Sequence, residues 1–356
     1  MGRVSVIIPA YNAAATIAAT VASALGQTYG DLEVIVVDDG STDSTAAIVA
    51  DFARADPRLR LLRYPNGGQA IARNRGIAAA VGELITFLDA DDQWTPEKVA
   101  EQVRALDENP EAAIAYGWTD YVDGAGRLLH RGSYVSLSGR VLMALTQVNF
   151  IESGSNAMVR RSALEAIAAA TADGGGPFEP ALVPSEDWDL WLRLAERFAF
   201  VAIARPQVRY RVAEESQSAN VRRLERSCRA CLGRAFARRP ELVAVRPVAL
   251  GNLYKYLLAK ALASVPRRGC APRSLPLVFR LWLRFLRYDQ PRERPWLPLK
   301  LSVKVWVRAI ALATVPGPWL RSLDQRPDRF PWRPLKRSLN CDSLLGHIQR
   351  PRSPDF

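Results

Sequence analysis

The sequence has few cysteines and no long, purely apolar run, and each absence excludes a class of protein. Its four cysteines are irregularly spaced, too sparse for a disulfide scaffold, and lack the second nearby pair that a zinc site needs. The uncharged run 5–30 is interrupted by Pro9, Asn12 and several threonines, so it predicts a strand, a loop and a helix instead of a signal peptide or membrane span. We therefore expect a chain that remains in a reducing cytoplasm.

Charge is distributed unevenly along the 356 residues, of which 49% are hydrophobic and 24% charged. This composition excludes intrinsic disorder, and the length allows two domains or one domain with an extension. Residues 1–204 hold 16 Lys and Arg against 26 Asp and Glu, whereas residues 205–356 hold 32 against 10. The halves carry −10 and +22, which add to the net +12. The basic half predicts an anionic partner, either nucleic acid or a lipid headgroup surface.

The first hundred residues alternate between two kinds of segment. The β-branched segments span 4–9, 32–39, 58–64 and 83–92, and the Ala-rich helical segments span 16–25, 44–55, 68–80 and 97–106. This alternation is typical of a parallel sheet with helices on both faces. Such sheets bind ligands at the carboxyl ends of their strands, where the polar clusters of this sequence fall.

Two aspartates at one of these strand ends suggest a metal site. Asp89 and Asp91 of the segment LDADD are two residues apart after an apolar strand, so they can face the same cavity. Mg²⁺ or Mn²⁺ takes few protein carboxylates and completes its shell with water and phosphate. We expect Asp91 to hold the metal and Asp89 to lie beside the metal and a ribose. The alternative is an Asp-rich, solvated turn.

Five segments, taken in order, resemble the family 2 glycosyltransferases with a GT-A fold. They read VSVIIPAYNA, EVIVVDDGSTD, NGGQAIARNRG, GELITFLDADDQW and SEDWDLW, and the resemblance covers roughly residues 3–212. It implies an α/β fold with a Rossmann-like, mostly parallel sheet between helices. It also implies transfer of a sugar from a nucleoside-diphosphate sugar, with a UDP-sugar as the leading expectation, in cell-surface glycan or polysaccharide biosynthesis.

The resemblance assigns roles to residues of the first three motifs. Pro9 and Tyr11 would line the base pocket, Asp39 would bind the base and Asp38 would support the ribose. Arg73 would face the nucleotide or its diphosphate. Each residue also has an ordinary structural reading: a strand-end turn for the first pair, helix capping for the acids and a helix-surface position for the arginine.

Asp187 of SEDWDLW would be the catalytic base in this resemblance. Attack of an acceptor hydroxyl on the anomeric carbon needs one carboxylate to take the proton, while a metal stabilises the departing diphosphate. One base and one metal suffice for a single displacement, which inverts the anomeric centre. The alternative is that Glu186 and Asp187 are acids that favour the N-terminus of a helix that Ser185 caps.

Two departures from the family pattern bear on function. Ala213 stands where many relatives carry a metal-binding His, with Glu214 or water as substitutes, which questions metal dependence more than fold. No Gln-x-x-Arg-Trp segment is present, which favours single sugar addition over polymer synthesis. Two alternatives remain open: a metal-dependent phosphotransferase or phosphohydrolase on a doubly wound sheet, and a non-catalytic membrane-binding adaptor.

We divide the chain into a catalytic domain (1–212), a helical extension (213–264) and a basic, Pro-rich amphipathic region (265–356), where prolines predict short helices. Cationic stripes in the last region suit an anionic membrane interface, or else their apolar neighbours pack on the protein. No nucleic-acid-binding signature accompanies the charge, so we expect no nucleic acid. We expect a glycan or lipid-linked acceptor and a peripheral position on the cytoplasmic face of a membrane. The stripes comprise Arg280, Arg284, Arg287, Lys300, Lys304 and Arg308.

Overall fold

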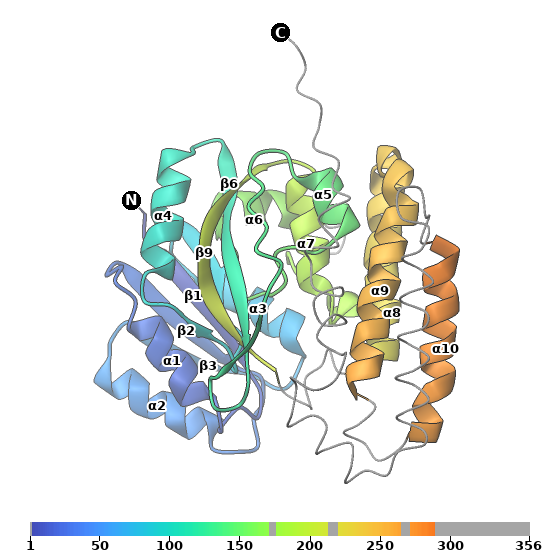
Figure 1. Ribbon diagram of the computed structural model, residues 1–356. Helices are drawn as coiled ribbons and strands as arrows, with labels where there is room; N and C mark the ends of the chain where they lie inside the picture. Colours follow the sequence, from blue (N-terminus) through green and yellow to red (C-terminus); the bar gives the residue numbers. More distant parts are fainter. Residues whose placement is uncertain (1, 171–175, 213–219, 265–270, 289–356) are drawn as a thin grey trace.

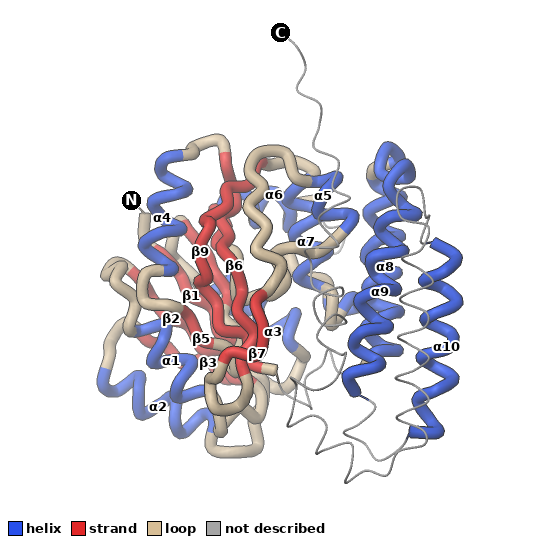
Figure 2. Tube along the Cα trace, in the orientation of Figure 1, coloured by secondary structure: helices blue, strands red, loops and turns tan. Residues whose placement is uncertain are grey.

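The computed structural model describes residues 2–170, 176–212, 220–264 and 271–288 (Figure 1). Within these residues, nine strands form one sheet in the order β3-β2-β1-β4-β8-β6-β9-β5, with β7 paired to β6. Figure 2 shows this sheet as one layer between helices. The strands are β1 (Val4–Ala10), β2 (Leu32–Asp38), β3 (Leu59–Arg63), β4 (Leu84–Phe87), β5 (Gln93–Trp94), β6 (Ala112–Val122), β7 (Leu128–Arg131), β8 (Met158–Arg160) and β9 (Ala199–Arg211).

The first four strands form the parallel half of the sheet. β1 and β2 are buried along their whole length, as expected for β-branched strands covered on both faces. Their register places Ala10 opposite Asp38, and Asp38 opposite Arg63 of β3, so the carboxyl ends lie at one edge. The remaining strands join through antiparallel β8, with β6 and β9 parallel to each other. The predicted α/β fold with a mostly parallel sheet is confirmed.

Helices cover both faces of the sheet (Figure 1). Side chains of α1 (Ile17–Leu25), α2 (Thr45–Ala55) and α4 (Lys98–Glu108) pack on one face, and those of α3 (Gln69–Ala79) on the other. Gly76 lets α3 approach β1 closely, since a Cβ there would lie 2.4 Å from a methyl group of Ile7. The second face also carries α5 (Leu142–Gln147), α6 (Arg161–Ala168), the short helix η1 (Pro180–Leu182) and α7 (Glu186–Ala195).

A helical unit follows β9 and packs against the helices that cover the second face (Figure 1). It comprises α8 (Val221–Arg238), the short helix η3 (Pro240–Val245), α9 (Arg246–Ser264) and α10 (Ala271–Tyr288). Leu194 of α7, Leu232 of α8, Leu257 of α9 and Leu281 of α10 belong to one hydrophobic core. None of the described helices has the length and hydropathy that crossing a bilayer requires.

α10 differs from the short helices that the prolines predicted. It spans 18 residues and contains Pro276. A proline in the second turn removes one hydrogen bond to the first turn, and packing of Val278 and Phe285 in the core offsets that loss. Ala213, Glu214 and the predicted stripe 300–308 lie outside the described residues.

Candidate active site

The ends of β1 and β2 place three of the predicted nucleotide-binding residues near one another. Pro9 is buried within β1, and Tyr11 follows it with 53% of its surface exposed. Asp38 ends β2 fully buried, and its carboxylate accepts a hydrogen bond from Nε of Arg63 at 3.2 Å. Of these three residues, only Tyr11 presents a large exposed surface to a ligand.

Asp39 organises the loop that follows β3. Its carboxylate accepts hydrogen bonds from the backbone amides of Gly67 and Gly68 at 2.9 and 2.7 Å, and pairs with Arg75 at 3.1 Å. Gly68 has φ +91°, a conformation that glycine adopts without strain. The guanidinium of Arg75 lies 4.5 Å from the ring centroid of Tyr64. Sequence reasoning did not single out Arg75 or Tyr64, although Arg75 belongs to the same ARNRG motif as Arg73.

Arg73 joins the end of β4 to the start of α7. Its side chain is 2% exposed, and it donates to Asp89 Oδ1 and to Glu186 Oε1, each at 2.6 Å. Phe178 lies beside the guanidinium, 5.1 Å from ring centroid to Cζ. Burial alone would lower the pKa of Arg73, but the charges of Asp89, Glu186 and Asp187 raise it. The guanidinium therefore stays charged and holds two segments together, instead of facing solvent.

Asp89 and Asp91 differ in how they are bound. The Asp89 carboxylate accepts from Arg73 and from Gln69 Nε2 at 3.0 Å, whereas no described side chain donates a hydrogen bond to the Asp91 carboxylate. Burial, followed by the negative charge of Asp89, raises the pKa of Asp91 to about 6. Asp91 is therefore an acid in an electronegative setting that a bound cation would relieve.

Asp92, which sequence reasoning passed over, fixes the same turn from inside the protein. It is fully buried and accepts from Ser155 Oγ at 2.6 Å and from the backbone amide of Arg211 at 3.0 Å. Ser155 Oγ in turn accepts from the amide of Asp89 at 3.0 Å, and Arg211 Nε donates to the carbonyl of Asp91. The turn is thus held by β9 and by the segment that precedes β8.

Asp187 lies in the first turn of α7, next to Glu186, which pairs with Arg73. Glu186 before it and Trp188 after it are buried, whereas Asp187 is partly exposed. Burial, followed by the charge of Glu186, raises the pKa of Asp187 to about 7, although Arg73 works in the opposite direction. A carboxylate with a pKa near neutrality is suited to act as a general base.

Residues 5–168 match the family model described as Glycosyl transferase family 2. These residues form a family 2 glycosyltransferase domain. The match includes the motifs that carry Tyr11, Asp39, Arg73 and Asp91, and ends before α7.

Curated relatives match about a third of the chain. An uncharacterized glycosyltransferase of Nostoc sp. is 35% identical over 132 residues, which are 37% of this chain and 41% of the relative. The chondroitin synthase of Pasteurella multocida is 39% identical over 129 residues, which are 36% of this chain and 13% of that protein. The alignments thus span less than half the length of these relatives.

Solved structures share the fold over most of the chain. TarS 1-349 of S. aureus in complex with UDP-GlcNAc has 17% identity and a TM-score of 0.52, covering 80% of this chain and 89% of that one. The mannosyltransferase PcManGT of Pyrobaculum calidifontis in complex with GDP-Man and Mn²⁺ has 23% identity and a TM-score of 0.52, covering 88% and 86%. At these identities the likeness is one of fold, and the predicted GT-A fold is confirmed.

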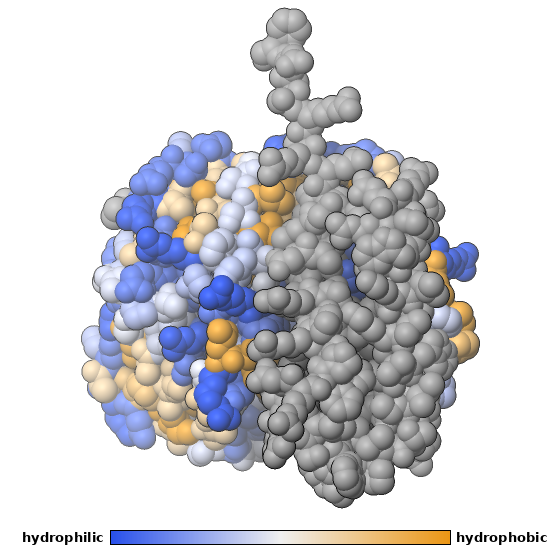
Figure 3. All heavy atoms as spheres, in the orientation of Figure 1, coloured by the Kyte–Doolittle hydropathy of each residue, from blue (hydrophilic) through white to orange (hydrophobic). Residues whose placement is uncertain are grey.

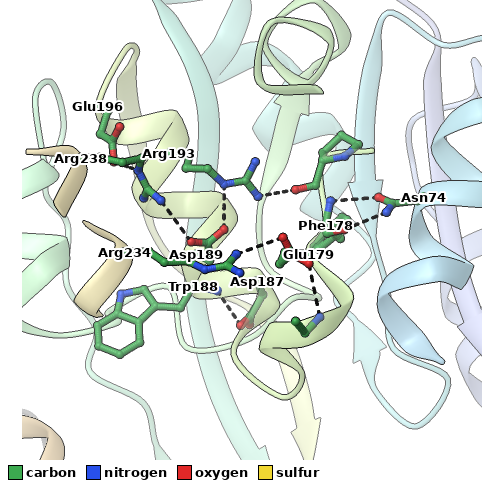
Figure 4. A network of polar contacts seen from close by, with 12 residues as sticks. Asn74, Phe178, Glu179, Asp187, Trp188, Asp189, Arg193, Glu196, Arg234 and Arg238 are labelled. Atoms are coloured by element: carbon green, nitrogen blue, oxygen red, sulfur yellow. Dashed lines mark hydrogen bonds and ion pairs between the residues drawn. The ribbon is translucent and has the colours of Figure 1, made fainter. Parts of the chain in front are cut away.

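The segment 179–196, which contains Asp187, is joined to α8 by ion pairs (Figure 4). Asp189 accepts from Arg193 at 2.7 Å and lies 3.6 Å from Arg238 of α8. Glu179, just before η1, pairs with Arg234 of α8 at 3.0 Å. The helical unit thus fixes the position of α7 by contacts that join residues far apart in the sequence.

The glycosyltransferase domain offers carboxylates that fit a divalent cation. No group of three or more His, Cys, Asp and Glu side chains in the described ranges is arranged to hold a metal. Mg²⁺ and Mn²⁺ sites in phosphate-transfer enzymes nevertheless need only one or two carboxylates, because water and the diphosphate supply the other ligands. Asp91, which lacks a side-chain donor among the described residues, and neighbouring Asp89 meet that requirement.

Proposed function

We propose that this protein transfers a sugar, with inversion, from a nucleoside-diphosphate sugar to an acceptor hydroxyl. Asp187 acts as the base, and Asp91, with Asp89 beside it, holds a divalent cation. The observation that carries the proposal is the buried Arg73, which brings Asp89 and Glu186 to within 2.6 Å of one guanidinium and so places Asp187 near the aspartate pair.

The residues divide the chemistry between them. Asp187 takes the proton of the attacking hydroxyl, and its pKa near 7 allows it to be ionised at neutral pH. Asp91, with Asp89 beside it, would hold the cation, which would supply positive charge to the departing diphosphate. Exposed Tyr11 provides an aromatic surface for the base, and Asp39 fixes the Gly67–Gly68 loop.

Similar proteins support the donor class and the biological setting. TarS was solved with UDP-GlcNAc and PcManGT with GDP-Man, so a nucleoside-diphosphate sugar is the donor we propose, with a UDP-sugar tested first. A chondroitin synthase among the relatives favours a glycan acceptor in cell-surface polysaccharide biosynthesis.

Product analysis tests the reaction. The full chain is incubated with Mn²⁺, one UDP-, GDP- or dTDP-sugar and a panel of glycan and lipid-linked acceptors. We expect one donor to yield nucleoside diphosphate and a glycoside of inverted anomeric configuration, detected by NMR.

Control reactions separate this function from its alternatives. Nucleotide release that is equally fast without an acceptor would point to a phosphohydrolase and contradict the transfer reaction. Retained anomeric configuration would contradict single displacement with Asp187 as the base. No turnover with any donor, together with no nucleotide binding, would leave a non-catalytic protein.

A further inference from the structure

The solvent-facing side of α8 carries a row of arginines that pair with no carboxylate among the described residues. α8 contains six arginines and a single acid, Glu225, which is buried. Arg222, Arg226 and Arg229, here termed the arginine stripe, are exposed and follow helical spacing i, i+4, i+7. No carboxylate of the described chain pairs with them, in contrast to Arg234 and Arg238 of the same helix.

The rest of this face of α8 is nearly flat. Gly233 and Ala237 continue the stripe, and Ala230 lies beside it, all three exposed. These side chains are small, and among the described residues a Cβ at Gly233 would meet open space. The stripe therefore resembles a contact face more than a set of scattered surface charges.

α10 extends this face with further cations and with apolar side chains. Arg280 and Arg284 of α10 both reach Glu225 of α8, which connects the two helices. Burial raises the pKa of Tyr254 of α9, while the positive charges of both Arg229 and Arg280 counteract that rise. Arg229 of the arginine stripe and Arg280 of α10 therefore both lie near the hydroxyl group of Tyr254.

The outer side of α10 mixes the two kinds of side chain. Phe279 and Leu283 are 44% and 48% exposed, and exposed Arg280 and Arg287 lie on the same side of the helix. Figure 3 shows hydrophobic and hydrophilic residues next to each other along the edge of the molecule where α10 lies. Exposed apolar residues four apart, flanked by cations, are typical of helices that lie in a membrane interface.

We infer that the arginine stripe of α8 and the outer face of α10 together form a docking surface for an anionic lipid bilayer. The stripe binds the headgroup phosphates, and Phe279 and Leu283 enter the boundary between headgroups and acyl chains. The net charge of +22 after residue 204 complements such a surface, and the apolar pair favours a bilayer over a soluble polyanion, which offers nothing for apolar side chains to enter. This surface lies outside the proposed catalytic residues, so its test needs no activity.

Co-sedimentation of the full chain with vesicles tests the surface. We expect binding to phosphatidylcholine vesicles that contain about one-third phosphatidylglycerol, weak binding to pure phosphatidylcholine, and loss of binding as salt is raised. The triple variant Arg222→Gln, Arg226→Gln, Arg229→Gln should lower the partition coefficient by about a hundredfold, as expected for three basic residues at about 1 kcal/mol each.

A variant of equal charge controls for net charge. Arg54→Gln, Arg104→Gln, Arg127→Gln removes three exposed arginines from the glycosyltransferase domain and should retain binding near the wild-type level. Equal losses in both triple variants, or wild-type binding by the α8 variant, would overturn the proposal. Circular dichroism establishes that each variant is folded.

A second variant separates a bilayer from a soluble anionic polymer. Phe279→Ser with Leu283→Ser should weaken vesicle binding at least about tenfold, because it removes the apolar area that enters the interface, while leaving polyphosphate binding unchanged. If vesicle binding does not depend on these two residues, or if the chain binds polyphosphate but not anionic vesicles, the surface serves a soluble polyanion and the membrane proposal fails.

Discussion

Arginine has opposite uses in the glycosyltransferase domain and in the helical unit. Arg73 is buried between two carboxylates, whereas Arg226 is exposed and has no carboxylate partner in the described chain. In the glycosyltransferase domain, Asp89 and Glu186 fix the guanidinium of Arg73, and the two ion pairs hold the site together. In the helical unit, the exposed guanidinium of Arg226 can bind an anionic partner outside the protein. The net charge of a region therefore does not reveal the role of its arginines, which depends on the partner of each side chain.

The largest predicted effect is on kcat and comes from Asp187, which lies next to the ion pair of Arg73 and Glu186. Asp187→Asn should lower kcat by about 10³-fold, within the range that general bases contribute, and leave nucleotide affinity within about twofold. Stopped assays of nucleoside diphosphate release measure the first quantity, and calorimetry the second. Asp51→Asn, which changes an exposed acid on α2, is the control, and an equal loss in both variants would contradict the assigned role.

A matched pair of arginine substitutions tests the comparison itself. Arg73→Met leaves Asp89 and Glu186 without their shared partner and should lower the free energy of unfolding by about 3–5 kcal/mol. Arg226→Met should change it by no more than about 0.5 kcal/mol. Urea titration monitored by tryptophan fluorescence measures both, and similar values would break the distinction between the two regions.

Substitutions of the neighbouring acids Asp91 and Asp92 should affect nucleotide binding and stability separately. Asp92→Ala leaves Ser155 and the Arg211 amide without a buried acceptor, and should lower the free energy of unfolding by about 1–3 kcal/mol. Asp91→Ala removes no side-chain hydrogen bond within the described residues, so it should change that free energy little while abolishing metal-dependent nucleotide binding. Thermal unfolding and calorimetry measure the two effects, and a reversed pattern would contradict this division.

The smallest predicted effect is a shift in pH dependence. Asp187 must be ionised to act as a base and its pKa is about 7, so kcat/KM should fall as pH decreases through 7. Glu186→Gln removes a charge that raises this pKa, so the acidic limb should move to lower pH. Arg226→Gln should leave the limb in place. A limb that does not move in Glu186→Gln would indicate a different titrating group.

The sequence predicts the elements of this protein better than their long-range contacts. Alternating β-branched and Ala-rich segments predicted the parallel strands and their helices because that periodicity is local. Arg73 instead bonds to Asp89 and Glu186 at separations of 16 and 113 residues. Helix periodicity gives no sign that α3 turns this side chain inward, and the resemblance directed it to the nucleotide.

The roles of Asp92 and of the arginine stripe also depend on long-range contacts that the sequence does not predict. Asp92 reads as one more acid of an Asp-rich turn, and only the fold brings Ser155 and the amide of Arg211 to it, 63 and 119 residues away. The basic charge of the second half was visible in the sequence. Which arginines of α8 have a carboxylate partner among the described residues depends on Asp189 of α7 and on Glu179, just before η1.

Calorimetric titration of UDP, GDP and dTDP, with and without Mn²⁺, into wild type and Asp91→Ala tests the central claim most directly. A metal-assisted nucleoside-diphosphate sugar transferase should bind one of these nucleotides tightly, with UDP tested first, and should lose that binding when either Mn²⁺ or the Asp91 carboxylate is removed. Absence of binding by all three nucleotides under both conditions would contradict the proposed reaction. Binding that is indifferent to both the metal and Asp91 would contradict the proposed metal site.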